Sequence, residues 1–349
     1  MNLKSITQKS SYKKIIINFL IFFLFVYLTI SIVFKKNNIS EIILNIKQVN
    51  IFFIILAIIS MFIFVSCEGI NIRRVLKTCG CKISLIQSFK YALVGFFFSS
   101  ITPSASGGDP AQAYFMSKDK LPISHSALAL LVELSSFQFV SCAIAIIGFI
   151  YNYDILIKNI GNIKYLLVLG LTINILILFF LLVMIFSKIF ALKLVDILCK
   201  ILDFFHYKKT TTIKEKLLSS IEEYHQCSLY LKENKVVLLK IVLTTIVQII
   251  LYHSIPYFVY LSFGLKEVSF LTFIFMQAVL YISVSSLPFP GAMGITEGGF
   301  MILFKMFFPT SILSSAMIIS RGISFYLFVI VSALLILLFI LVDKFRKKV

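Results

Sequence analysis

The chain of 349 residues is 60% hydrophobic, with a formal net charge of +18 and a mean hydropathy of +1.01. A chain of this length is too apolar to be a soluble globular protein, and its composition is typical of a membrane protein with several spans. The positive charge is spread over short polar segments without interleaved aromatic residues, so we expect no nucleic-acid binding.

Six apolar runs are long enough to cross roughly 30 Å of hydrocarbon at about 1.5 Å per residue. The first run follows Lys13 and Lys14 and has no Ala-x-Ala-like cleavage site, so we interpret it as a retained helix and not as a signal peptide. The six predicted spans cover residues 15–34, 50–68, 121–150, 162–187, 236–262 and 311–341. An even number of spans places both termini on one side of the membrane.

Basic residues orient these spans, because Lys and Arg in short loops resist translocation. Most of the 33 Lys and Arg residues lie on one side if both termini are cytoplasmic, with clusters before residue 15, at 73–90, at 188–240 and after Asp343. The sequence therefore predicts a multi-pass protein of the cell membrane with cytoplasmic termini.

One integral membrane domain is predicted over residues 1–349, with a first half at about 14–150 and a second at about 162–343. Within the second half, residues 188–235 form the one sizeable polar segment, whose mixed charge and helically spaced apolar positions indicate an amphipathic cytoplasmic linker. This linker is too short for an acyltransferase domain and has no Walker-type loop. No Cys or His spacing suggests a metal site, and we expect no cofactor.

Two further apolar segments, 91–116 and 268–308, are interrupted by Pro and Gly. In hydrocarbon an unpaired backbone group costs several kcal/mol, so such breaks persist only where protein buries them or where they line a wet cavity. We therefore predict re-entrant or broken helices beside a substrate pathway. The residues that break the helices are Pro103, Gly107 and Gly108 in the first segment and Pro288, Pro290, Gly291 and Gly294 in the second.

The two breaks also share an order of residues. Each has Ser-Ser, then Pro, then Gly, then an acid, which is Asp109 in the first and Glu297 in the second. The series span, span, broken segment, span occurs twice, and the second series begins from the opposite side of the membrane. This arrangement favours an inverted-topology repeat with a binding site near the midplane. The fold class predicted is thus an all-α polytopic membrane protein with about six full spans and two broken segments.

Four charged residues lie at predicted membrane depth: Asp109, Glu133, Glu297 and Arg321. An intramembrane charge costs roughly 2.5 to 3.5 kcal/mol on insertion scales, so each is either functional or paired. Arg321 could hold a phosphate through its planar guanidinium, or it could pair with Glu297. Asp109 before Pro110 is equally an ordinary helix N-cap. Proton coupling through any of the three acids is also open.

Three motifs together resemble the flippase-like membrane domain of the lysylphosphatidylglycerol synthetase family. They are Thr-Pro-Ser-x-x-Gly-Gly-Asp-Pro from Thr102, Leu-Pro-x-Pro-Gly-x-x-Gly-x-x-Glu from Leu287, and Arg321. The family includes the multiple peptide resistance factor, so the resemblance implies a domain that moves aminoacylated phosphatidylglycerol between leaflets. It also implies that Asp109, Glu297 and Arg321 occupy polar motif positions. The full-length factor has a C-terminal aminoacyl-transfer domain, which we do not expect in this chain.

Two functional hypotheses follow, with membrane phospholipids as partners in both. In the first, a lipid translocase moves a phospholipid or a lipid-linked headgroup between leaflets. Arg321 then holds phosphate, Asp109 and Glu297 hold a cationic or hydroxylated headgroup, and Glu133 is a further substrate-binding residue. In the second, the chain is a phosphatidylglycerol lysyltransferase, or a membrane subunit of a separately encoded synthase, that contributes to cationic peptide resistance. No Ser-His-Asp order, GxSxG or HExxH motif supports catalysis, so we predict no catalytic residue.

Overall fold

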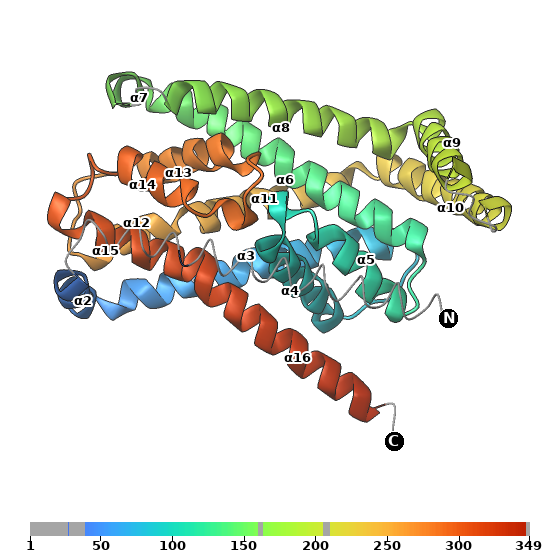
Figure 1. Ribbon diagram of the computed structural model, residues 1–349, viewed down its shortest axis with the longest axis horizontal. Helices are drawn as coiled ribbons and strands as arrows, with labels where there is room; N and C mark the ends of the chain where they lie inside the picture. The colour runs from blue at the N-terminus through green and yellow to red at the C-terminus, as the bar shows by residue number, and fades with distance from the viewer. Residues whose placement is uncertain (1–26, 28–38, 160–162, 205–209, 347–349) are drawn as a thin grey trace.

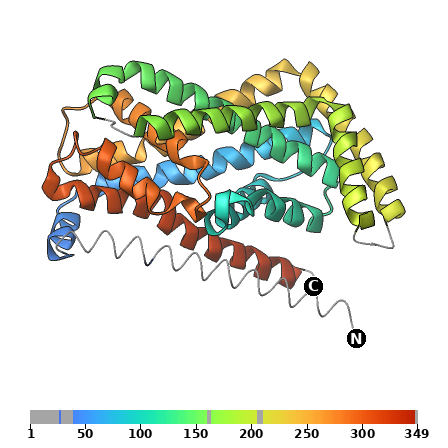
Figure 2. The same cartoon turned by 45° about the horizontal axis from the view of Figure 1, so that its top comes forward.

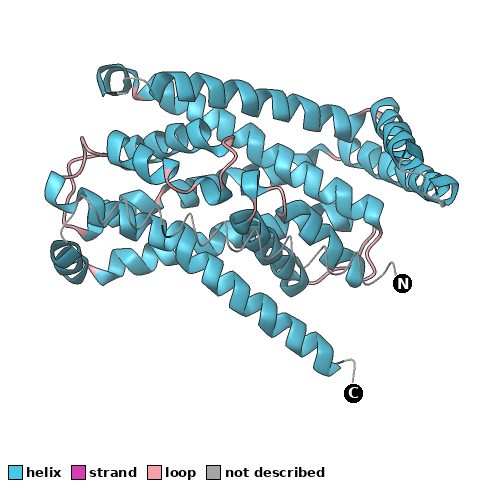
Figure 3. Cartoon of the chain, viewed as in Figure 1, coloured by secondary structure: helices cyan, strands magenta, loops and turns pink. Residues whose placement is uncertain are grey.

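The computed structural model describes residue 27 and residues 39–159, 163–204 and 210–346. Over these residues the chain is a bundle of helices without any strand (Figure 3), which confirms the all-α fold class. The elements are α2 (Ile39–Lys47), α3 (Ile51–Thr78), α4 (Leu85–Ile101), η1 (Pro103–Ala105), α5 (Gly108–Lys118), α6 (Ile123–Tyr151), α7 (Tyr153–Asn159), α8 (Ile163–Phe186), α9 (Lys188–Phe204), α10 (Thr210–Glu233), α11 (Lys235–His253), α12 (Ile255–Ser262), α13 (Phe270–Ser285), η2 (Pro290–Ala292), α14 (Ile295–Leu303), α15 (Thr310–Arg321), η3 (Gly322–Leu327) and α16 (Phe328–Arg346).

Five stretches of helix are long and apolar enough to cross a membrane, so the protein is a multi-pass membrane protein. They correspond to five of the six predicted spans, and the sixth, 15–34, lies outside the described residues apart from residue 27. The shorter apolar helices α4 and α13 are the first arms of the two broken segments. The five spans are Ile51–Thr78, Ile123–Tyr151, Tyr165–Phe186, Lys235–Ser262 and Thr310–Val342.

Helix α3 extends to Thr78, well beyond the predicted boundary at residue 68. Its last turns contain polar side chains that α11 satisfies. The Asn71 amide donates to the Thr245 hydroxyl at 3.0 Å, and Arg74 Nη1 donates to the Lys240 carbonyl at 3.0 Å. Because these hydrogen bonds replace water, the helix continues through residues that hydropathy alone assigns to a loop. Glu68 therefore lies inside a span and not at its end.

The two broken segments enter the bundle from opposite ends and meet near its middle, as Figure 1 shows for α4 and α5 on one side and α13 and α14 on the other. Both first arms begin at a serine N-cap. Ser84 Oγ accepts from the Gln87 amide at 3.1 Å, and Ser269 Oγ accepts from the Thr272 amide at 3.2 Å. Each cap satisfies a backbone N–H that would otherwise lack a partner at the helix start.

Helix α13 lies at the centre of the largest apolar core and packs against α6, α8, α11, α12 and α14. The approach of α8 is especially close, since a Cβ atom built on Gly170 would lie 2.2 Å from the Ile282 carbonyl oxygen. Small residues of this kind let helices associate closely in a membrane, where lipid is as apolar as leucine. The second broken segment is therefore held by packing on several sides.

The C-terminal span is interrupted by η3, a π-helical segment that separates α15 from α16. α15 packs against α12 and α14, whereas α16 packs against α4 and extends along the lower edge of Figure 1 and beneath the other helices in Figure 2. Leu334, Leu337 and Leu341 on α16 are more than half exposed, as expected of a face that contacts lipid.

The predicted linker at 188–235 consists of α9 and α10, which pack against each other at one end of the bundle (Figure 1). α10 is fixed to the spans by two hydrogen bonds: Tyr224 donates to the Met184 carbonyl at 3.1 Å, and Ser124 donates to Glu223 at 2.8 Å. The described residues of this segment are therefore mostly helical. The cytoplasmic location of this end, and the division into two repeated halves, stay predictions.

Candidate functional site

The two breaks adopt the same backbone conformation. Thr102 has φ −115° and ψ 145°, and Phe289 has φ −110° and ψ 139°. The proline that follows each of them opens a short 3₁₀ turn, and the next two residues are left-handed, with φ of 50° and 54° in η1 and 56° and 49° in η2. η1 and η2 contact each other. This local match is consistent with the predicted inverted repeat, which stays a prediction.

Glycine is required in the second break for a reason of space as well as of conformation. A Cβ atom on Gly291 would lie 2.2 Å from the Phe325 ring, and its φ of 56° already favours glycine. The equivalent residue of the first break is Ser104, whose side chain is exposed. In the first break the tight position is Gly108, whose Cβ would meet Ser99 Oγ at 2.0 Å. The predicted residues Pro103, Gly107, Pro288, Pro290 and Gly294 all lie in or beside these two turns.

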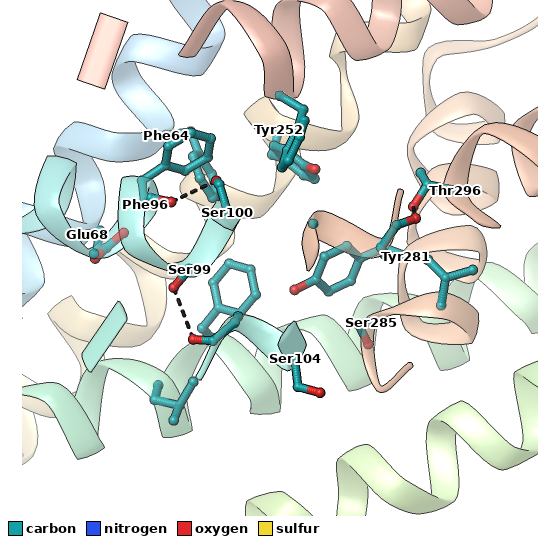
Figure 4. Close-up of a pocket in the computed structure, with 18 of the residues that line it drawn as sticks. Phe64, Glu68, Phe96, Ser99, Ser100, Ser104, Tyr252, Tyr281, Ser285 and Thr296 are labelled. Atoms are coloured by element: carbon teal, nitrogen blue, oxygen red, sulfur yellow. Dashed lines mark hydrogen bonds between the residues drawn. The ribbon is translucent and has the colours of Figure 1, made fainter. Parts of the chain in front are cut away.

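A cavity of about 280 Å³ lies where the two breaks meet (Figure 4). Figure 4 shows Glu68, Ser99 and Tyr281 around this space, with Ser104 from one break and Thr296 just after the other. Its polar lining comes from both broken segments and from the helices α3, α6, α11 and α15. The polar residues are Glu68, Ser99, Ser100, Ser104, Asp109, Gln112, Glu133, Gln248, Tyr252, Gln277, Tyr281, Ser285, Thr296 and Arg321.

Three carboxylates line this cavity: Glu68 on α3, Asp109 at the start of α5, and Glu133 on α6. Glu68 accepts a hydrogen bond from Gln112 Nε2 at 2.6 Å, and Glu133 accepts one from Gln248. The negative charges of Glu68 and Asp109 both act on Glu133. Among the described residues none of the three forms an ion pair.

Arg321 and Glu297 form an ion pair beside the cavity. Arg321 Nε donates to Glu297 Oε1 at 2.9 Å, and the two side chains are 7% and 4% exposed. Glu297 also accepts from the Gly294 amide at 2.7 Å and from the Tyr326 hydroxyl at 3.3 Å. Arg321 Nη2 donates to the Gly291 carbonyl at 2.9 Å. Ion pair and break are therefore one connected unit.

The pair divides the predicted site residues into two groups. Asp109, Glu133 and Arg321 line the cavity, whereas the Glu297 carboxylate lies behind Arg321 and does not. The hydrogen bonds of Arg321 to other described residues use Nε and Nη2 and leave Nη1. The sequence left two partners open for Arg321, a phosphate and Glu297, and the structure pairs it with Glu297. Direct contact of Glu297 with a headgroup stays a prediction.

Glu68 is the main residue that the sequence reasoning missed. The predicted span at 50–68 ends at this residue, and Asn71, Arg73 and Arg74 follow it closely. The signal that could have placed it deeper is the continued helical spacing of apolar residues, since Ile72, Val75 and Leu76 are all buried. Among the described residues no group of three or more His, Cys, Asp or Glu side chains is placed to hold a metal ion.

Comparison with known proteins places these features in a family. Residues 15–332 match the family described as the lysylphosphatidylglycerol synthase TM region. The chain belongs to this family. The match covers four of the five described spans in full, the fifth as far as residue 332, and both breaks, and it confirms the resemblance inferred from the motifs. The family is a membrane-domain family, so its description supports the multi-pass architecture. The match does not establish an activity.

Archaeal relatives resemble the chain over most of their length. A UPF0104 membrane protein of Pyrococcus horikoshii is 27% identical over 307 residues, which is 83% of this chain and 88% of the relative. One from Archaeoglobus fulgidus is 22% identical over 310 residues, or 86% of this chain and 91% of the relative. Their names state that they are membrane proteins and give no activity.

Proposed function

We propose that the chain is a lipid translocase, whose cavity admits the polar headgroup of a phospholipid while the acyl chains stay in the bilayer. The observation that supports this most is the charged cavity at the contact of η1 and η2, inside otherwise apolar spans. Charge at this depth is expensive unless it is paired or serves transport. At about 280 Å³, the cavity is near the small end of ligand pockets, which suits a headgroup without its chains.

The charges favour a headgroup with a cationic amine and a phosphate. Glu68, Asp109 and Glu133 give the cavity an acidic side, where an amine would be held by charge-assisted hydrogen bonds. Arg321 lines the same cavity and has Nη1 available for a phosphate oxygen. An aminoacylated phosphatidylglycerol carries both groups, which agrees with the lipid in the family's description.

Glu297 acts in this proposal as a positioning residue. Its carboxylate fixes the Arg321 guanidinium against the second break, so the direction of Arg321 Nη1 is set before a lipid arrives. This revises the earlier hypothesis that Glu297 itself holds the headgroup. Its loss should alter both the stability of the protein and the binding of phosphate.

The test is translocation by purified protein in liposomes that contain lysylphosphatidylglycerol, followed with a membrane-impermeant amine reagent. Asp109→Asn and Glu133→Gln should slow exposure of the amine by roughly tenfold or more, because each removes one charge-assisted contact. Glu267→Gln, the same chemical change at an exposed loop position, should have no effect. Normal rates in correctly inserted Asp109 and Glu133 variants would contradict the proposal.

The family description names a synthase, so the alternative of a lysyltransferase or of a subunit of one needs its own measurement. Cells with and without the protein are compared for total lysylphosphatidylglycerol and for its share in the outer leaflet. A translocase changes the share and leaves the total. A fall in the total supports synthesis or partnership with a synthase, and co-purification then identifies the partner.

A further inference from the structure

A second cavity of about 390 Å³ lies at the end of α3, where α10 and α11 meet it. Three cationic residues line it: Arg73, Arg74 and Lys77. The remaining lining residues are Ile70, Thr78, Tyr230, Asn234 and Val237, so no acid contributes to it. It shares no residue with the cavity between the breaks.

The two guanidinium groups are fixed in place by neutral groups. Arg74 Nη1 donates to Asn71 Oδ1 at 2.7 Å and to Thr244 Oγ1 at 3.0 Å, and Arg73 Nε donates to the Ile83 carbonyl at 3.1 Å. These bonds leave the other nitrogens of both groups for a ligand. Among the described residues, no ion pair involves either arginine or Lys77.

Three positive charges without a counter-charge repel one another. Arg73 and Lys77 are four residues apart on one helix, where like charges are destabilising, and Arg74 adds a third charge to the same pocket. A bound anion would relieve this repulsion. Because guanidinium presents its donors in a planar fork, two arginines beside a lysine suit the oxygens of a phosphate group.

The pocket lies where one span ends and another begins. α3 ends at Thr78, and the span that starts at Lys235 begins next to Asn234 in the pocket wall. Tyr230 is 59% exposed, as is typical of the aromatic belt at a membrane surface. Within the pocket, Ile70 on α3 is 36% exposed and gives an apolar wall beside the cationic residues. A phosphate in the pocket could thus carry acyl chains along this side of α3.

We propose that this pocket binds the phosphate of an anionic lipid headgroup at the membrane surface, apart from the cavity between the breaks. Basic pockets between helices on the cytoplasmic side are suited to such headgroups. The same N–H donors would also bind free phosphate. The ligand group assigned is therefore a phosphate whose negative charge is not neutralised by a cation in the same headgroup. Binding here does not require that the protein translocates lipid.

The test is equilibrium binding of a fluorescent phosphatidylglycerol to the purified full chain in detergent. Arg73→Gln/Lys77→Gln should weaken binding by roughly tenfold or more, because charge-assisted contacts to phosphate are lost. The matched control Lys120→Gln/Lys200→Gln removes the same charge at exposed positions outside the pocket and should bind like the wild type. Lys77→Gln alone, an exposed position, provides a variant whose folding is not at issue.

Competition identifies the source of the phosphate. Displacement by unlabelled phosphatidylglycerol and not by millimolar inorganic phosphate supports a lipid ligand, whereas displacement by both supports a site for phosphate in general. Equal binding of phosphatidylcholine, or unchanged affinity in both pocket variants, would overturn the proposal. Because the readout is binding alone, this result stands apart from the translocation measured in liposomes.

Discussion

Breaking the ion pair between Glu297 and Arg321 should be among the most damaging single changes in the protein. The two side chains are 4% and 7% exposed and joined at 2.9 Å, so Glu297→Gln leaves a buried guanidinium without its counter-charge. Removing one partner of a buried pair typically costs about 3 to 5 kcal/mol. The amide would keep a hydrogen bond, but not the charge, and Arg321→Gln should cost a similar amount.

The double variant distinguishes an ion pair from two independent contacts. Glu297→Gln/Arg321→Gln removes both charges, so it should be more stable than the sum of the two single losses predicts, by about 2 to 3 kcal/mol. Unfolding can be followed with a thiol-reactive dye, because Cys67 and Cys142 are free and buried in the native state. The exposed pair of Lys188 and Glu222 provides the control, since Glu222→Gln should change the unfolding midpoint little.

Additive single losses would refute this reasoning. An unfolding midpoint of Glu297→Gln equal to that of the wild type would also refute it, because solvent or another group would then satisfy the Arg321 charge.

Three other predictions concern single sites. Gly291→Ala should lower stability by about 1 to 3 kcal/mol through overpacking, whereas Ser104→Gly, the equivalent position of the other break, should change the unfolding midpoint little. Glu68→Gln should slow lysylphosphatidylglycerol translocation and leave the unfolding midpoint near that of the wild type, because its glutamine partner on α5 can still hydrogen-bond to an amide; equal activity would remove Glu68 from the site. A hydrogen bond from Lys188, together with its charge, lowers the pKa of Glu222, so their pair stabilises the protein above the ordinary carboxylate pKa and is lost as the pH falls through the lowered value. The small stability deficit of Glu222→Gln should accordingly disappear in acid, and a deficit that persists there would contradict this.

The spans and the breaks could be predicted because each depends on local sequence. Long apolar runs identify spans by their length. Helix-breaking residues such as Pro103 and Gly291 interrupt a helix whatever surrounds them. The acids of the two breaks were found for the same reason, since a charge in an apolar segment is conspicuous. These features need no knowledge of which helices are neighbours.

Pairing and depth could not be predicted, because they depend on tertiary contacts. Glu68 is part of the cavity only because α11 satisfies Asn71 and Arg74 and so lets α3 continue through a polar stretch. The Glu297 carboxylate faces Arg321 and not the cavity because of how α14 packs beside α15. Hydropathy averages over a helix and therefore contains no information on which face meets which neighbour.

The π-helical turn after Arg321 sets how the side chains of α16 are rotated about the helix axis relative to those of α15. Arg321 and Tyr326 are five residues apart, which in a regular α-helix leaves their side chains about 140° apart around the axis. In a π-helix the repeat joins residue i to i+5, so both side chains reach the same oxygen of Glu297. Removing one residue from Gly322–Leu327 would turn the rest of the span by about 100°. The lipid-facing side of α16 and the anchoring of the second break are therefore set by the length of one short segment.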